Sequence, residues 1–412
     1  MSVILPFRGY RPAPAYASEV PAPPYDVLDS KEARVMAEGH PHSFLHVNKP
    51  EIDLPEDVDG HADAVYTTGA RNLQRFIAEG VLVRDAKPCL YVYRQRMGNH
   101  VQTGVVPAAS VDEYQQDLIK KHEFTRRDKE DDRTRHTDEL NANTGPVFLT
   151  YPARAEIDGL IARITARPAA HDVVTADGFG HTVWVVDDAG EIADLQRLFS
   201  TIPCTYVADG HHRAASGSRV RELRKAKNPN HTGKEPYNFF MAVFFPHDQL
   251  AIMDYNRVVK DLAGMTEEQF LARVREKFEI APATSGKPTE QKTFGMLLGG
   301  KWYRLAAKPG TFPEGHPVKS LDVSILQDNL LAPILGIADP RSDKRIDFVG
   351  GIRGIGELER RCRLDAKVAF AMYPTSIEQL MAIADTGNVM PPKSTWFEPK
   401  LRDGMVVRVI ED

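Results

Sequence analysis

Five consecutive residues, Asp209 to Arg213, read Asp-Gly-His-His-Arg and carry the densest potential chemistry of the chain. The preceding Cys204 to Val207 is rich in strand-forming residues, and Ala214 to Lys227 has the composition of a helix. The motif is therefore predicted on a strand-to-helix turn, where unpaired backbone N–H groups and the positive end of the helix dipole form an anion site. Gly210 allows close approach of the backbone to a ligand. We expect Gly210, His211, His212 and Arg213 to bind phosphate, with the Arg213 guanidinium donating two parallel hydrogen bonds.

A carboxylate beside an anion site is costly unless it has a chemical role. Asp209 is therefore expected to bind Mg²⁺ or to accept a proton, which makes Asp209 and His211 candidate catalytic residues. The competing interpretation is a capped turn with Asp209 as the N-cap residue. A metal-dependent hydrolase with Asp209, His211 and His212 as ligands ranks last, because adjacent histidines on one turn rarely face the same metal.

The segment from Lys120 to Asn143 is the most charged part of the chain and contains the pair His122-Glu123. A glutamate near phosphate chemistry can accept a hydroxyl proton, so Glu123 is a candidate base. The alternative is a solvated helix face, with i,i+4 pairs joining Glu123 to Arg127 and Asp131 to Arg135.

Two further segments could contact phosphate. Lys393, Ser394 and Thr395 follow a double proline, and such a rigid loop could bind a phosphate group; a surface turn is the alternative. The run from Gly350 to Gly356 is rich in glycine, but its spacing is not that of the dinucleotide fingerprint, and the chain has no Walker-type motif.

The elements that would position these residues alternate irregularly, which indicates an α/β fold of the mixed α+β kind. The proline-rich first thirty residues predict an extended arm packed on a domain. A length of 412 residues favours two domains. We expect residues 1–235 to form an α/β domain with the arm and the phosphate-binding motif, and residues 236–412 to form a second α/β domain with the Lys-Ser-Thr loop. Further expected elements are a helix over Asp63 to Ala78, strands over residues 146–151, 182–186 and 238–245, a strand over residues 249–253 paired with the last of these, and a helix capped by Thr266.

Composition narrows the class of protein. Hydrophobic residues make up 42% of the chain and charged residues 26%, which is typical of a soluble globular protein. A net charge of −5 gives no sign of binding nucleic acid. Three cysteines distant in sequence argue against a zinc knuckle or a disulfide framework. No secretory signal and no membrane span is evident, so we expect a cytoplasmic protein.

The sequence as a whole resembles a large bacterial family catalogued as domain of unknown function 1015. The resemblance runs nearly end to end. It is carried by Pro6 to Gly9, Pro23 to Val27, Ser43 to Val47, His122-Glu123, Asp131 to Arg133, Asn143, Asp209 to Arg213 and Met390 to Phe397.

The motif at Asp209 to Arg213 also looks like the phosphate-binding box of the ParB/sulfiredoxin superfamily, which includes free serine kinases. This resemblance implies a ParB/sulfiredoxin-like nucleotide-binding core, phosphate and metal binding at the box, and Glu123 as base. It implies ATP or ADP and Mg²⁺ as cofactors, and phosphotransfer between an adenine nucleotide and serine or phosphoserine. Sulfiredoxins carry a reactive cysteine where this chain has His211, so reductase chemistry is not expected of Cys204. A non-catalytic nucleotide sensor is the alternative function, and the oligomeric state is not indicated.

Overall fold

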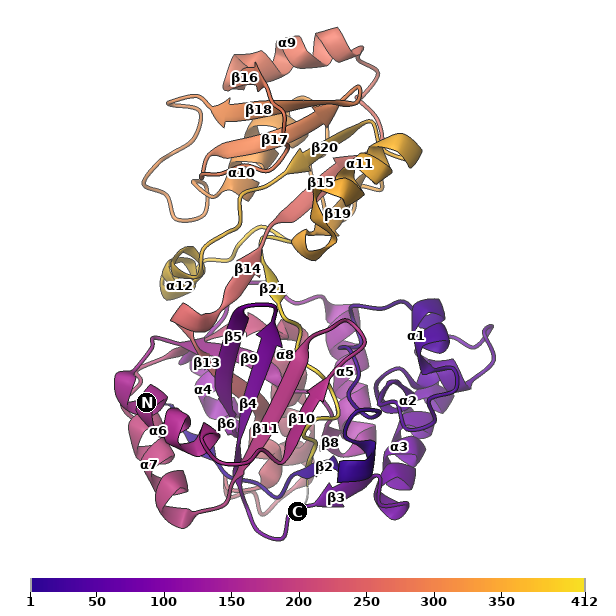
Figure 1. The fold of residues 1–412 in the computed structure, drawn as a ribbon, viewed down its shortest axis with the longest axis vertical. Coiled ribbons are helices and arrows are strands. Elements are labelled where there is room, and N and C mark those ends of the chain that lie inside the picture. Colours follow the sequence, from indigo (N-terminus) through magenta and orange to yellow (C-terminus); the bar gives the residue numbers. More distant parts are fainter. Residues whose placement is uncertain (1, 411–412) are drawn as a thin grey trace. The chain divides into compact units, whose positions relative to one another are not determined.

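The computed structural model describes residues 2–410 and divides into two compact units (Figure 1). Met1–Leu250 and Pro399–Asp412 form the first unit, and Ala251–Glu398 forms the second. The expected boundary after residue 235 is wrong, because the strand that follows it lies inside the main sheet of the first unit. The second unit is thus inserted into the first, and the chain returns to the first unit for its last described residues.

A ten-stranded mixed sheet is the framework of the first unit. Its central strands pair in both senses: β13 is parallel to β9, whereas β9 and β12 are antiparallel. In spatial order the strands are β10 (His171–Val174), β11 (Gly180–Val186), β4 (Leu90–Met97), β5 (His100–Val106), β13 (Phe239–Pro246), β9 (Val147–Tyr151), β12 (Thr205–Asp209) and β7 (Ile119–Lys120), with β6 (Ala108–Ser110) pairing with β13 and β1 (Ile4–Leu5) with β6. The strands over residues 146–151, 182–186 and 238–245 are confirmed.

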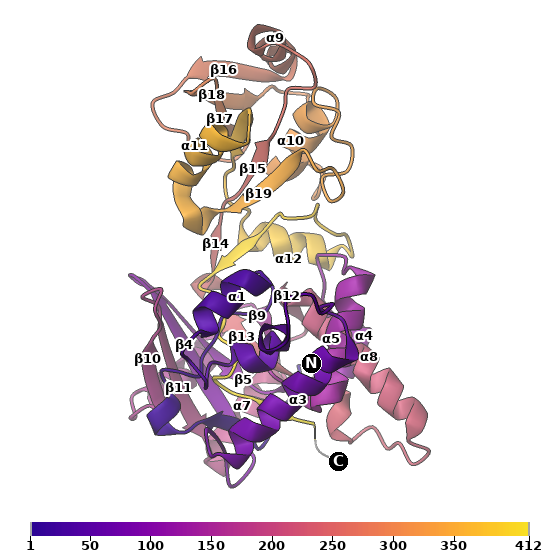
Figure 2. The ribbon, with the colours of Figure 1, turned by 90° about the vertical axis from the view of Figure 1, so that its right-hand side faces the viewer.

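Helices of the first unit pack on this sheet and on one another. They are α1 (Ser30–Ala37), α2 (Leu45–Asn48), α3 (Asp63–Ala78), α4 (Val111–Gln115), α5 (Arg127–Leu140), α6 (Ala155–Thr165), α7 (Ala189–Phe199) and α8 (His211–Lys227). Helix α8 packs on β9 and β13. Helix α5 packs on α8, and α3 packs on α5, as Figure 2 also shows. Helix α3 has the predicted bounds.

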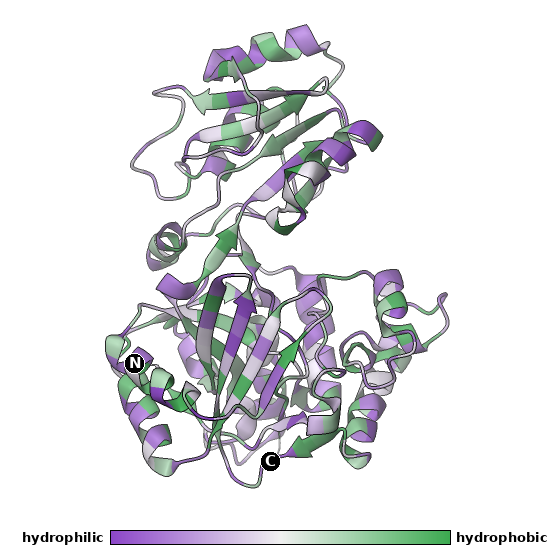
Figure 3. Ribbon diagram, in the orientation of Figure 1, coloured by the Kyte–Doolittle hydropathy of each residue, from purple (hydrophilic) through white to green (hydrophobic). Residues whose placement is uncertain are grey.

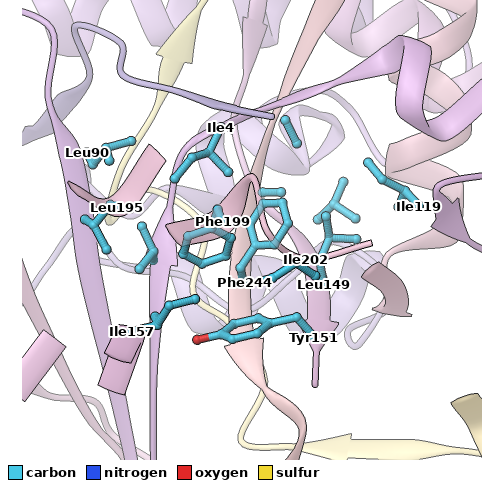
Figure 4. Close-up of a cluster of buried hydrophobic side chains, with 14 of the residues drawn as sticks. Ile4, Leu90, Ile119, Leu149, Tyr151, Ile157, Leu195, Phe199, Ile202 and Phe244 are labelled. Carbon is cyan, nitrogen blue, oxygen red and sulfur yellow. The ribbon is translucent and has the colours of Figure 1, made fainter. Parts of the chain in front are cut away.

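Two hydrophobic cores hold the first unit together. The larger one joins the sheet to α6 and α7 through side chains such as Leu149, Phe199 and Phe244, all of them buried (Figure 4). A second core gathers α1, α2 and α3 around Phe44 and Phe76. The proline-rich arm is held by isolated β-bridges, such as that of Phe7 with Cys89 and that of Ala22 with Asp403. Its β2 (Tyr10–Pro12) pairs with β3 (Leu82–Arg84), so the arm is packed as predicted.

The second unit is built on a six-stranded antiparallel sheet. In spatial order its strands are β16 (Phe278–Pro282), β18 (Lys301–Ala307), β17 (Thr293–Leu298), β20 (Val368–Ala371), β15 (Tyr255–Val259) and β19 (Ile346–Gly350), and its helices are α9 (Glu267–Lys277), α10 (Asp322–Leu326), α11 (Gly354–Leu364) and α12 (Ile377–Asp385). Thr266 caps α9 in a reciprocal capping box with Gln269, as predicted.

One strand pairing was predicted wrongly. The strand near residues 249–253 is β14 (Ala251–Met253), and it pairs with β21 (Trp396–Glu398) rather than with β13. The 3₁₀ turn at His247–Gln249 separates β14 from β13. This antiparallel pair brings the two ends of the second unit together.

The helices of both units carry hydrophilic as well as hydrophobic residues (Figure 3), as expected of helices that have one face on a core and the other in solvent. Across residues 2–410, none of them is both long enough and apolar enough to cross a bilayer.

We predict that a fragment spanning residues 251–398 folds by itself. Ala251 opposes Glu398 in the register of β14 and β21, so excision leaves its ends paired, and the fragment keeps its own core around Val258, Leu358 and Ala369. Circular dichroism during urea titration should show one cooperative transition. A gradual, non-cooperative loss of signal would contradict the division into units.

Candidate functional site

The motif Asp209 to Arg213 lies where β12 ends and α8 begins, as the sequence predicted. Gly210 is the N-cap residue and has φ +86°, a left-handed conformation that glycine adopts without strain. Asp209 is therefore not the N-cap residue, and the capped-turn interpretation is wrong. Among the described residues, none accepts a hydrogen bond from the backbone N–H of His211 or His212. Two donors at the positive end of a long helix are thus available to an anion.

The Asp209 carboxylate is already engaged on both oxygens. Its Oδ1 accepts from the Gly210 backbone N–H at 2.9 Å, and its Oδ2 lies 2.8 Å from the Lys400 ammonium. Burial by itself would raise the pKa of Asp209, but Lys400, the Gly210 N–H and His211 together lower it, and the net shift is downward. An ammonium at this distance repels a second cation. The expectation that Asp209 binds Mg²⁺ therefore does not fit this donor set.

His211 and His122 form a buried pair of imidazoles. The rings meet edge to face with centroids 4.4 Å apart, and the residues are only 5% and 2% exposed. Burial lowers the pKa of His122 to about 4 and, helped by the neighbouring His122, lowers the pKa of His211 well below its usual range. Both rings are thus neutral at pH 7.

Glu123 lies beside this pair, in the loop that precedes α5. Its Oε2 is 3.9 Å from His211 Nδ1, and its side chain is 41% exposed. Since α5 begins only at Arg127, Glu123 cannot form the expected helical i,i+4 pair, and Arg135 pairs with Asp63 instead of Asp131. The solvated-face interpretation is wrong, and the structure brings Glu123 to the box.

His212 ties the same loop to the start of α8. Its Nε2 accepts a hydrogen bond from the Arg126 backbone N–H at 3.1 Å. His211 and His212 therefore face different partners, His122 and Arg126, and do not converge with Asp209 on one metal.

Arg213 binds a carboxylate within the protein. Its Nη1 and Nη2 donate to Asp403 Oδ1 and Oδ2, both at 2.7 Å, and the Asp403 side chain is 1% exposed. Asn48 Nδ2 also donates to Asp403. Burial by itself would lower the pKa of Arg213, but the Asp403 carboxylate, with smaller contributions from Asp26 and Tyr25, holds the pKa above its usual value. The guanidinium fork expected to bind phosphate is thus occupied by Asp403.

Gly145 lies directly against this ion pair. A Cβ placed there would be 1.6 Å from Arg213 Nη1 and 1.9 Å from Asp403 Oδ1, so no larger residue fits without moving the pair. The centroid of the Tyr25 ring lies 5.6 Å from the Arg213 guanidinium carbon and 4.0 Å from that of Arg133. The cavity beside these residues measures about 30 Å³, which suits water and not a nucleotide.

Lys393, Ser394 and Thr395 belong to the second unit. The Ser394 hydroxyl is buried and donates to the Pro391 carbonyl at 2.6 Å, while the Lys393 ammonium lies over the Tyr255 ring. Ser394 thus stabilises its own turn. Phosphate binding by these three residues stays a prediction.

Comparison with known proteins identifies the family. The family model described as Protein of unknown function (DUF1015) matches residues 4–324. The chain belongs to this family. No curated protein matches it.

The fold comparisons concern distant proteins. Two mutants of free serine kinase, one in complex with AMP and one with ADP, are each 12% identical, with 74% of this chain and 92% of that chain covered and a TM-score of 0.37. SbnI from Staphylococcus aureus, with a C-terminal truncation, is 12% identical, with 72% and 85% covered and a TM-score of 0.38. These likenesses do not extend to individual residues.

Several site residues in this DUF1015 member were missed by sequence reasoning. Lys400 and Asp403 lie far from the box in sequence but contact it through the returning C-terminal segment. The run from Lys400 to Gly404 combines charges and a glycine as the box does, which is the one sequence signal that could have found it. Tyr25 and Arg133 carried the family resemblance without a physical role, and the contacts of the Tyr25 ring with Arg133 and Arg213 now supply one.

We predict that Arg213→Met lowers the free energy of unfolding by about 3–5 kcal/mol, because it leaves the Asp403 carboxylate buried without its partner. The double variant Arg213→Met/Asp403→Leu should recover most of the loss, since it removes both charges. Urea unfolding of the wild type, both single variants and the double variant measures the coupling. Additive effects would show that the pair does not stabilise the fold as a unit.

Proposed function

We propose that this chain is a phosphotransferase that moves a phosphoryl group between an adenine nucleotide and a small hydroxyl metabolite, serine or phosphoserine, at a box of the ParB/sulfiredoxin type. The observation that supports it most is the pairing of two open backbone N–H donors, on His211 and His212, with the Glu123 carboxylate beside the same helix start. The N–H donors can bind a phosphate group, and the carboxylate can accept the proton of a hydroxyl group.

The anion site supports the phosphate half of the reaction. The first turn of α8 presents its N–H groups, and the helix dipole adds a positive potential at the same point. Lys400 adds an ammonium 2.8 Å from Asp209 Oδ2, and the two side chains are 20% and 38% exposed, so solvent reaches this ion pair. Phosphoryl transfer needs mainly positioning and charge neutralisation, and these groups provide both.

Glu123 supports the hydroxyl half. In the forward direction the hydroxyl oxygen of serine forms a bond to the terminal phosphorus, Glu123 accepts the hydroxyl proton, and the bond to the leaving ADP oxygen breaks. In reverse, phosphoserine gives its phosphoryl group to ADP and Glu123 returns the proton. The half-exposed position of Glu123 lets a small substrate approach it.

A thermal-shift screen with ATP, ADP, serine and phosphoserine in the presence of Mg²⁺, followed by turnover assays on each hit, tests the proposal. We expect stabilisation by ADP or ATP and formation of phosphoserine or serine by the matching pair. Binding without turnover would instead support a nucleotide sensor, and no binding of any nucleotide would reject both.

We predict that Glu123→Gln reduces turnover by roughly 10²–10⁴-fold while nucleotide affinity stays nearly constant, because the amide keeps the size but cannot accept the proton. Glu156→Gln, on the exposed face of α6, is the matched control, and Cys204→Ser tests thiol chemistry; neither should change turnover. Steady-state kinetics and nucleotide titration of all three variants decide the matter. Unchanged turnover in Glu123→Gln would exclude the base role.

A further inference from the structure

His122, Glu123 and His211 gather three potential metal ligands at one point. One ligand atom from each lies within 4.8 Å of the other two. Two imidazoles and one carboxylate form a ligand set that binds divalent first-row transition metals and leaves positions open for water or substrate.

Unsatisfied nitrogens provide a second, independent observation. Within residues 2–410, nine buried side-chain polar atoms lack a hydrogen-bond partner, and three of them belong to this ring pair: both ring nitrogens of His122 and Nε2 of His211. Buried polar groups without partners are rare in folded proteins and point to an ion or another unassigned partner. A metal ion that accepts one lone pair from each imidazole would satisfy one nitrogen of His122 and one of His211.

The charges and openings around the cluster also suit a cation. Glu123 supplies a negative charge, and its 41% exposed side chain opens the cluster to solvent. Asp209 lies near both rings, but its charge is matched by Lys400, and the start of α8 and Lys121 oppose a cation. Direct coordination by three ligands has to outweigh this opposition.

We propose that His122, Glu123 and His211 bind one divalent transition metal ion of the Zn²⁺ type. In a tetrahedral site with bonds of about 2.0–2.1 Å, ligand atoms stand about 3.4 Å apart, so the cluster contracts on binding. Mg²⁺ is a poor occupant, because it prefers oxygen ligands and two of these three are imidazoles.

This site does not include Asp209 and does not depend on the proposed phosphotransfer. Metal binding and phosphotransfer constrain each other through Glu123, because a carboxylate oxygen that holds a metal cannot accept a proton. Metal binding is therefore measured directly, without nucleotide and without any turnover assay.

The test uses the full chain, stripped with a chelator and titrated with Co²⁺ as the spectroscopic probe and Zn²⁺ as competitor. We expect one Co²⁺ per chain, visible d–d bands of a four- or five-coordinate ion, no intense thiolate charge-transfer band, and displacement by Zn²⁺. His122→Gln, His211→Gln and Glu123→Gln should each weaken binding by more than about 100-fold, since even outer-shell changes cost 10–100-fold. His100→Gln, whose ring contacts Gln102, is the matched control and should bind as wild type.

Thermal melts establish that each variant folds, and any variant that does not fold is left out of the comparison. The wild-type titration stands without them: a chain that retains no Co²⁺, or one that shows a thiolate band, overturns the site. Retained affinity in a folded His122→Gln or His211→Gln chain overturns it as well.

Discussion

The buried ion pair between Arg213 and Asp403 is the interaction on which the arrangement of the site depends. It joins Arg213, the last residue of the box, to Asp403, which lies in the segment that follows the second unit along the chain. The same segment carries Lys400 to Asp209 and pairs β22 (Arg408–Val409) with β8 (Ala142–Asn143). Gly145 is fixed by the pair because any side chain there would collide with both partners. The box is thus completed by residues distant in sequence, and its geometry requires the returning segment.

Burial sets the protonation states around the box. His122 and His211 are so enclosed that their charged forms are strongly disfavoured, and the pKa of His212 is lowered by burial too. An anion at this turn therefore meets neutral imidazoles, which can each donate only one N–H, and depends on the backbone donors of α8 for most of its hydrogen bonds. His212 holds the loop that carries Glu123 through the Arg126 backbone N–H, and phosphate binding by His211 and His212 stays a prediction.

The sequence predicted the box, its strand-to-helix setting and the mixed α/β fold because these features are local. Strand-forming residues before Gly210 and a helical run after it are enough to place the turn. The long-range features were not predictable in the same way. Asp403, the partner of Arg213, lies beyond an inserted unit in the sequence. The strand β14 looks like the second strand of a hairpin with β13, because its actual partner β21 is distant in sequence. A solvated helix face was the alternative for the charged segment before Asn143, yet two of its polar residues, Asp132 and His136, are buried; Asp132 accepts a hydrogen bond from Tyr66 of α3.

The fixed cations near the box differ in how readily they can change partner. Arg213, Arg133 and Lys400 each hold a carboxylate, from Asp403, Asp132 and Asp209 respectively. Asp403 and Asp132 are 1% and 8% exposed, so moving either arginine to a ligand would leave a carboxylate buried without its countercharge, which is strongly unfavourable. The Asp209 side chain is 38% exposed, so water can solvate it if Lys400 turns to a phosphate. If the proposed phosphate binds at this site, Lys400 is therefore the cation that can reach it, while Arg213 stays paired with Asp403.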